Sequence, residues 1–337
     1  MTTTLFPILK LPLIPLEIII EQLNFLDLVH ISMKSSKLKG ILQLLRLPVQ
    51  TLHVFVTERF YGIKILQNRN SSFIDACDSL PVDTYTEAVK IQGEPMHIWK
   101  DGRNALTVKS DSAKLATLET ITKHVWSFSR VAESFVTFGD VGEKIRSVFI
   151  WQLTTQLKEL NICFNNGSHV PISLEDLTFL LEGISTERLL LKVSCPGFKY
   201  QRPIRHPAIY IKCSRWIDFY KFSLGPETIS ANFYEQKVSN AVLNRLIKDW
   251  TEGKNPKLRE VLFIWNDTDP ESLAMAREHK TQPPRSILPN RNIDQLKRRC
   301  INYSIKFRFQ CQSVHYEVCL SVEEDLGLNG VYLEDQN

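Results

Sequence analysis

The first 48 residues of this 337-residue chain carry more apolar surface than so short a segment can enclose. They are rich in Leu, Ile and Pro, and their acidic residues are Glu17, Glu21 and Asp27. Apolar residues recur at helical spacing over three short stretches, and three such helices are too small to form a core of their own. Either the rest of the chain covers this surface or another protein does.

Residues that start and stop helices divide this segment into three. Pro15 suits the first turn of a helix that runs to about residue 24. Asp27 is the candidate cap of a second helix, and Ser35 or Ser36 of a third, which Pro48 closes.

After about residue 50 the pattern changes from helical spacing to strand-like alternation. Residues 51–60 alternate in this way, and residues 62–66 could pair back with them as a hairpin. Residues 67–105 are polar and interrupted by Pro and Gly, which predicts short strands and loops.

The most regular pattern covers residues 145–266. Apolar segments predict strands at 147–152, 157–164, 188–194, 208–213, 227–231 and 258–265. Two helices are predicted between them, at 173–182 and 239–252. Ser173 and Asp176 fit the capping template of the first, and Gly183 and Gly253 stand where the two helices should end.

The spacing of these strands approaches that of leucine-rich repeats. A strand follows Leu160 after about 29 residues, and Ile229 precedes Val261 by 32. The repeat is irregular and lacks an asparagine ladder. We therefore expect a mixed α+β or α/β fold, in which an irregular, leucine-rich-repeat-like curved sheet is backed by helices.

Composition and targeting signals indicate an intracellular protein, cytoplasmic or nuclear. Hydrophobic residues make up 43% and charged residues 23%, as in ordinary globular proteins. The most apolar early stretch, residues 11–20, contains two prolines and Glu17 and is about half the length that a bilayer requires. The seven cysteines are widely spaced without a C-x-x-C pair, which favours reduced thiols.

The weak net charge of +4 conceals a basic segment followed by an acidic one. Residues 280–312 hold eight basic side chains and one acid, including the run Lys297, Arg298 and Arg299, whereas residues 313–337 hold six acids and no Lys or Arg. Mutual neutralisation is one interpretation, and a phosphate-binding patch is the alternative.

No motif indicates catalysis or cofactor binding. The eight histidines are scattered without metal-ligand spacing, and there is no G-x-S-x-G elbow, dinucleotide fingerprint or P-loop. We therefore expect no enzymatic activity, metal site or cofactor.

Residues 6–48 resemble an F-box, in the variant typical of the large nematode F-box families. The matching residues are the Leu11-Pro12 entry, the Ile18-Ile19 pair, the Asp27-Leu28-Val29 turn, Ser32, Ser35 and Lys37. The first acidic residue, Glu17, comes later than in many F-boxes.

Residues 239–264 resemble the type 2 F-box-associated domain of the same proteins, which has a helix ending in Trp and Gly followed by Asn-Pro-Lys-Leu. The residues that carry this match, for which we expect a structural role, are Leu246, Trp250, Gly253, Asn255, Pro256 and Leu258.

The two resemblances together imply a substrate receptor of a cullin–RING ubiquitin ligase. The F-box would bind the Skp-family adaptor, and through it a cullin, and the C-terminal region would bind the target protein. The adaptor contacts would come from Leu11, Pro12, Leu16, Ile18, Ile19, Leu28, Ile31 and Leu38. The same residues could instead form the core of the helices, with some facing inward and some outward.

The predicted organisation is an F-box at 1–48, a strand-rich part at 51–140, the associated domain at 141–270, and a basic helix, strands and acidic tail at 271–337. Two alternatives remain. One is a nucleic-acid-binding module that uses residues 280–312, and the other is an interaction scaffold that binds no adaptor. No membrane partner is expected.

Overall fold

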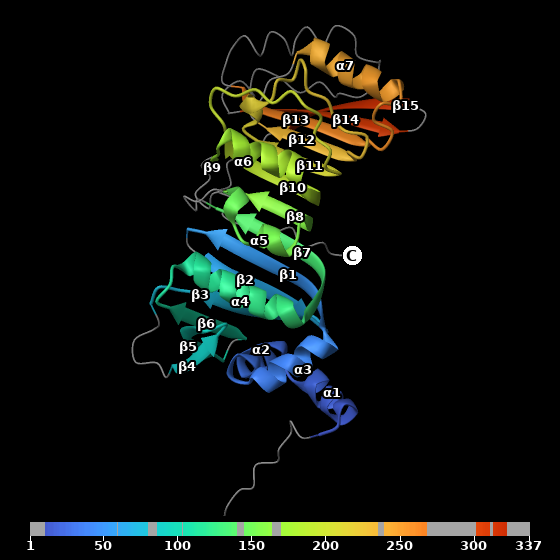
Figure 1. Cartoon of the computed structure of the whole chain (residues 1–337). Coiled ribbons are helices and arrows are strands. Elements are labelled where there is room, and N and C mark those ends of the chain that lie inside the picture. The colour runs from blue at the N-terminus through green and yellow to red at the C-terminus, as the bar shows by residue number, and fades with distance from the viewer. Residues whose placement is uncertain are drawn as a thin grey trace, which may run out of the picture. The chain divides into compact units, whose positions relative to one another are not determined.

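The computed structural model describes residues 11–58, 60–79, 86–102, 104–139, 145–163, 170–234, 239–267, 301–310 and 313–321. The chain has a mixed α/β fold, with a large sheet of parallel and antiparallel strands and helices packed on it (Figure 1). It divides into two compact units, Met1–Cys195 and Pro196–Asn337. The division falls within the segment 141–270, and the first 48 residues share a unit with the strands that follow them.

Three helices open the chain, as predicted: α1 (Leu13–Gln22), α2 (Phe25–Lys34) and α3 (Ser36–Leu45). The cap of α2 was predicted wrongly, because the Asn24 side chain, not Asp27, accepts a hydrogen bond from the Leu26 amide at 2.9 Å. Asp27 lies in the first turn, where a carboxylate is favoured by the helix dipole. Ser35 caps α3 as expected. Pro48 does not close α3, because the helix ends at Leu45 and Pro48 lies within the first strand.

The sheet of the first unit has the strand order β10-β8-β7-β1-β2-β3-β6-β5-β4. Strands β1 and β2 form the predicted antiparallel hairpin, and β1, β7, β8 and β10 run parallel. A short strand, β9, pairs with β10. The bounds are β1 (Leu47–Thr57), β2 (Phe60–Gln67), β3 (Asn70–Ala76), β4 (Glu87–Ile91), β5 (Glu94–Asp101), β6 (Ala105–Ser110), β7 (Ser129–Phe138), β8 (Gln156–Ile162), β9 (Val170–Pro171) and β10 (Ser185–Ser194).

Helices cover one face of this sheet. The longest, α4 (Lys114–Phe128), lies over the strands β1, β2 and β3, and α5 (Ile150–Leu153) and α6 (Leu174–Thr178) lie on the same side of the sheet (Figure 1). A 3-10 turn, η2 (Ile145–Ser147), precedes α5, and a π-helical turn, η3 (Phe179–Gly183), continues α6. The rings of Phe138, Trp151 and Phe179 join β7, α5 and η3 into one core.

The helix predicted at 173–182 is found, and the strand predicted at 147–152 is not. Ser173 accepts a hydrogen bond from the Asp176 amide at 3.0 Å, and the helix ends at Gly183. Residues 147–152 instead run from the end of η2 through a turn into α5. A short apolar run in a sequence does not distinguish a buried strand from a buried helix. In the structure the buried Asp176 carboxylate accepts a hydrogen bond from the Arg146 amide at 3.1 Å, which anchors the turn η2.

The second unit contains a smaller set of strands and one long helix. Strands β11 (Ala208–Lys212), β12 (Ser230–Tyr234) and β13 (Glu260–Asp267) are parallel, and β13, β14 (Ile301–Gln310) and β15 (Ser313–Ser321) are antiparallel. A 3-10 turn, η4 (Ser214–Trp216), follows β11, and the predicted helix 239–252 is α7 (Asn240–Thr251). Strand β12 begins three residues after the start predicted at 227.

Strands that are about 30 residues apart in the sequence pair with each other in parallel within each unit. Leu160 of β8 pairs with Leu189 of β10, and Ala231 of β12 pairs with Val261 of β13. The basic residues Lys297, Arg298 and Arg299 and the acidic tail after residue 321 lie outside the described residues.

Candidate docking surface on the N-terminal helices

The first helix presents apolar side chains on two opposite faces. Leu16 and Ile20 are buried, with 3% and 2% of their surface exposed. Ile14 and Ile18, one turn apart, are 72% and 58% exposed. A helix that is apolar all round is ordinarily covered on every side. The outward face of α1 therefore exposes apolar surface that other surface helices bury.

The next two helices add further exposed apolar residues. Ile31 on α2 is 41% exposed, Leu44 on α3 is 77% exposed, and Leu23, which follows α1, is 38% exposed. Together with Ile14 and Ile18 they are five of the nine large hydrophobic side chains that are exposed in the described part of the chain. Exposed apolar residues thus concentrate within the first 45 residues, which is typical of a binding surface.

The residues predicted as adaptor contacts divide into two groups. Pro12, Ile18 and Ile31 are exposed, and Leu11 and Ile19 are half-buried. The buried members of the set are Leu16, Leu28 and Leu38, which pack inside the first unit. The exposed and half-buried residues are therefore the ones that present surface to a partner. Some members of the set face inward and some outward, as the alternative interpretation of these residues allowed.

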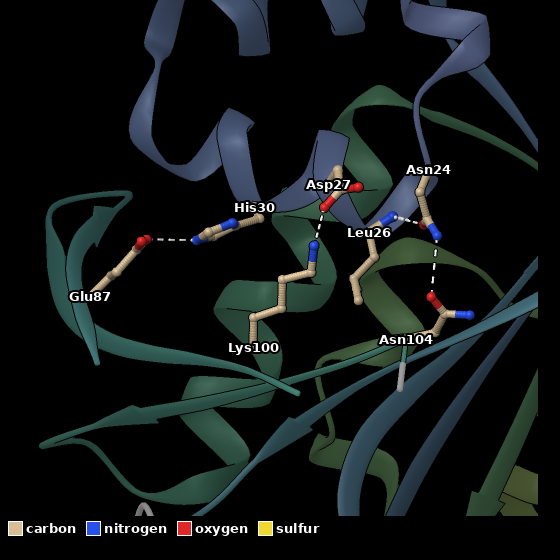
Figure 2. Close-up of polar contacts among 7 residues, drawn as sticks. All are labelled: Asn24, Leu26, Asp27, His30, Glu87, Lys100 and Asn104. Atoms are coloured by element: carbon tan, nitrogen blue, oxygen red, sulfur yellow. Dashed lines mark hydrogen bonds and ion pairs between the residues drawn. The ribbon is translucent and has the colours of Figure 1, made fainter. Parts of the chain in front are cut away.

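Polar contacts fasten α2 and its cap Asn24 to the strands β4 and β5 and to Asn104, the residue before β6, as Figure 2 shows. The Asn24 amide donates to the Asn104 side chain at 3.3 Å, and Asp27 forms an ion pair with Lys100. His30 contacts Glu87 at 2.8 Å. We call this set the α2 seam.

Lys34 at the end of α2 completes the α2 seam through a second ion pair with Glu87. The hydrogen bond with Lys34, and after it that with His30, lowers the pKa of Glu87. Glu87 is therefore ionised at neutral pH and holds the last turn of α2 against β4.

A buried polar pair lies beneath α2. The Ser32 hydroxyl donates to the Val29 carbonyl at 2.7 Å, and its oxygen lies 2.9 Å from Nε2 of His124 on α4. Because the hydroxyl proton is used by Val29, His124 must donate from Nε2. Burial, with a smaller effect from Lys39, lowers the pKa of His124 to about 4, so the ring is neutral. The three helices are thus fastened to the sheet unit by buried as well as surface contacts.

The residues that carry the second resemblance lie in and after α7. Leu246, Asn255 and Leu258 are buried, and Pro256 is exposed. Gly253 has φ +75°, a conformation that favours glycine just beyond a helix. Trp250 belongs to α7, and its side chain lies outside the described residues. The described side chains of this motif thus lie in the core and in the turn that follows α7.

Sequence reasoning missed three kinds of residue. It did not single out Ile14 or Leu44, although Ile14 stands one helical turn before Ile18. It did not identify the α2 seam, whose partners come from distant strands and leave no local signal. It also missed Arg245 of α7, whose guanidinium donates to the carbonyls of Phe219, Tyr220 and Phe222 and so fastens α7 to that loop.

Comparison with protein-family models, with curated proteins and with solved structures finds no match to this chain. None of the helices in the described part has both the length and the apolar character needed to cross a bilayer. Among the same residues, no three His, Cys, Asp or Glu side chains converge as metal ligands would. In the described part of the chain, Cys77, Cys163, Cys195 and Cys213 form no disulfide with one another.

Proposed function

We propose that the protein is a substrate receptor of a cullin–RING ubiquitin ligase, in which α1–α3 bind the Skp-family adaptor and the remaining chain binds a target protein. The observation that carries the proposal is the exposure of Ile14 and Ile18 on α1, in a segment that resembles an F-box. A helix with an unpaired apolar face suits insertion into an apolar groove.

Burial of this apolar face would supply a substantial part of the binding free energy of a specific complex. Complete burial of one Ile side chain contributes about 1.5–3 kcal/mol. Ile14, Ile18, Ile31 and Leu44 are partly covered already, so together they supply several kcal/mol when a partner covers the rest. Micromolar binding corresponds to about 8 kcal/mol, and polar contacts around the apolar centre must provide the remainder.

The receptor itself would make or break no covalent bond. The ligase would hold the target near the charged conjugating enzyme, which raises the effective concentration of its lysines. In this arrangement the α2 seam keeps the adaptor-binding helices in a fixed position relative to the sheet of the first unit.

The test is a binding measurement between the purified full chain and a purified Skp-family adaptor. The full chain is needed because cutting after residue 48 would uncover Phe25, Leu26 and Val29, which are buried. The paired change Ile14→Glu and Ile18→Glu is expected to weaken binding about tenfold or more, since each Glu would have to be desolvated.

A matched control is Ile229→Glu in the second unit, where the side chain is 41% exposed. It should leave adaptor affinity unchanged. If the wild-type chain binds no adaptor, the receptor proposal fails and the adaptor-free scaffold replaces it. If the wild-type chain binds and the paired variant binds equally well, the interface lies elsewhere.

A further inference from the structure

Three exposed cations gather at the carboxyl end of β11 in the second unit. Lys212 is the last residue of that strand, and its ammonium stands 5.8 Å from the centre of the Tyr234 ring at the end of β12. Arg215 follows in η4, and Lys199 donates a hydrogen bond to the Arg215 carbonyl. All three cationic side chains are exposed. We call Lys199, Lys212 and Arg215 the basic edge.

Main-chain contacts hold the basic edge together. Cys213 has φ +56°, a left-handed conformation that turns the chain out of β11 into η4. The Tyr200 amide donates to the Trp216 carbonyl at 2.7 Å. The Ser214 hydroxyl donates to the Tyr234 carbonyl at 3.2 Å. The segment around Tyr200 is thus fixed beside η4, and η4 is fixed beside the end of β12.

The positive charge of the basic edge is not neutralised by the described carboxylates. None of its three cations forms an ion pair within the described part of the chain. Residues 196–234 hold six Lys and Arg and two acids. Of these acids, Glu227 pairs with Lys257, and Asp218 accepts a hydrogen bond from the Tyr220 amide at 3.1 Å. Like charges held this close together favour an acidic partner.

An acidic segment of the same chain starts at the same edge of the sheet. Strand β15 ends at Ser321, which pairs with Asn302, and Asn302 pairs with Asn266 near the end of β13. Parallel pairing places that end of β13 beside the carboxyl ends of β12 and β11. The acidic tail, residues 322–337, follows directly and holds five acids and no Lys or Arg.

The acidic tail is long enough to span the distance to the basic edge. Four strand spacings separate β15 from β11, which is about 19 Å. Glu334 and Asp335 follow Ser321 by thirteen and fourteen residues, and an extended segment of that length spans about 43 Å. Such a tether keeps the effective concentration of these carboxylates in the millimolar range, so that even weak charge contacts are occupied.

A second segment begins and ends at this edge, and its charge excludes it as the occupant. Residues 268–300 connect β13 to β14, and Asp267 pairs with Ile301 where the two strands meet. The connection holds seven Lys and Arg against four acids. Its net positive charge is repelled by the basic edge, whereas the acidic tail is attracted to it. The run Lys297, Arg298 and Arg299 in this connection is the competing partner for the tail.

We propose that the acidic tail folds back across the carboxyl ends of β13 and β12 and covers the basic edge through Glu334 and Asp335. The tail then competes with nucleic acid and other polyanions, whose binding depends on unpaired Lys and Arg. The proposal does not depend on the receptor function, because it concerns contacts within one chain.

The experiment treats the full chain with a water-soluble carbodiimide, which joins a carboxylate to a lysine only where the two are in contact. Isotopically labelled and unlabelled chains are mixed in equal amounts, so that links within one chain differ in mass from links between chains. Proteolysis and mass spectrometry then identify the linked residues. Arg215→Glu reverses one charge of the basic edge, and Arg215→Lys, which keeps the charge, is its matched control.

We expect links within one chain from Glu334 or Asp335 to Lys199 or Lys212. Their yield should fall about fivefold in Arg215→Glu and stay unchanged in Arg215→Lys. It should also vanish at 1 M salt, where the Debye length is about 3 Å. Absence of these links, links between chains alone, or links from the tail to Lys297 in their place would overturn the proposal.

A second measurement tests the competition with polyanions. The full chain with Glu334→Gln and Asp335→Asn should bind single-stranded oligothymidylate at low salt about fivefold more tightly than the wild type. Adding Lys212→Glu and Arg215→Glu should remove this gain. The matched control is Lys64→Glu with Lys90→Glu, at two exposed positions of the first unit, and it should leave the gain intact. Equal affinity of the wild type and the tail variant, or a gain that survives reversal of the basic edge, would overturn the proposal.

Discussion

Acid should destabilise the first unit through His124, and the size of the effect follows from its surroundings. The ring is 2% exposed, and its Nδ1 has no hydrogen-bond partner within the described residues. Protonation would place a new N–H donor there without an acceptor. Burial accordingly lowers the pKa of His124 from 6.5 to about 4.

The sign of the pH dependence follows from this direction. Between these two pKa values the unfolded chain binds a proton at His124 that the folded chain does not. The contribution of the neutral His124 ring to the free energy of unfolding is therefore present above pH 6.5, and it is lost as the pH falls from 6.5 toward 4. For this one group the loss from pH 7 to pH 5 is about 2 kcal/mol. His53, whose pKa is lowered to about 4 mainly by burial, acts in the same direction.

The variant His124→Gln removes the titrating group and keeps a donor for Ser32. Hydrogen exchange of the α4 amides, corrected for the intrinsic effect of pH, measures the free energy of opening at pH 7 and pH 5. The wild type should lose about 2 kcal/mol more than the variant over this interval, and His97→Gln, at an exposed position, should behave as the wild type. Equal losses in wild type and His124→Gln would refute the reasoning.

Three further changes test other contacts of the first unit. Leu42→Ala on α3 removes a side chain that is completely buried and should cost about 2–5 kcal/mol of unfolding free energy, measured by denaturant titration. Asp27→Lys should destabilise by about 0.2–1 kcal/mol because it opposes Lys100, and adding Lys100→Asp should restore most of the loss; a strictly additive double variant would show that the pair does not interact. Gly62→Ala should lower the melting temperature and loosen the β1–β2 hairpin in hydrogen exchange, since its Cβ meets a backbone carbonyl; an unchanged melting temperature would contradict this packing.

The sequence predicted the helices and strands whose signals are local. The hairpin of β1 and β2 alternates cleanly, and Ser35 and Ser173 cap their helices with their own side chains. The helix α4 was not predicted because its buried face includes Thr117, Thr122 and His124, which break the apolar period. These hydroxyls are accommodated by donating to helix carbonyls, as Thr122 does to Leu118 at 2.7 Å. Such pairing depends on the folded helix and cannot be read from residue type.

The candidate sites likewise have features that local sequence signals predict and features that depend on tertiary contacts. The apolar excess of the first 48 residues indicated a binding surface, but not which residues face outward, because Leu16 and Ile18 both fit a helical apolar stripe and differ only in their tertiary surroundings. The cluster of rings formed by His53, Phe55 and Phe135 gave no signal at all. His53 and Phe55 look like one half of an alternating strand, and Phe135 joins them only through the pairing of β1 with β7, about eighty residues apart in sequence.

The most direct test of the receptor proposal is hydrogen exchange of the full chain with and without a purified Skp-family adaptor. The proposal predicts slower exchange in α1 and in the exposed parts of α2 and α3, with unchanged exchange in α7 and in the strands β1, β2 and β3. An adaptor that leaves α1–α3 unprotected, or that protects only the sheet or the second unit, would contradict it.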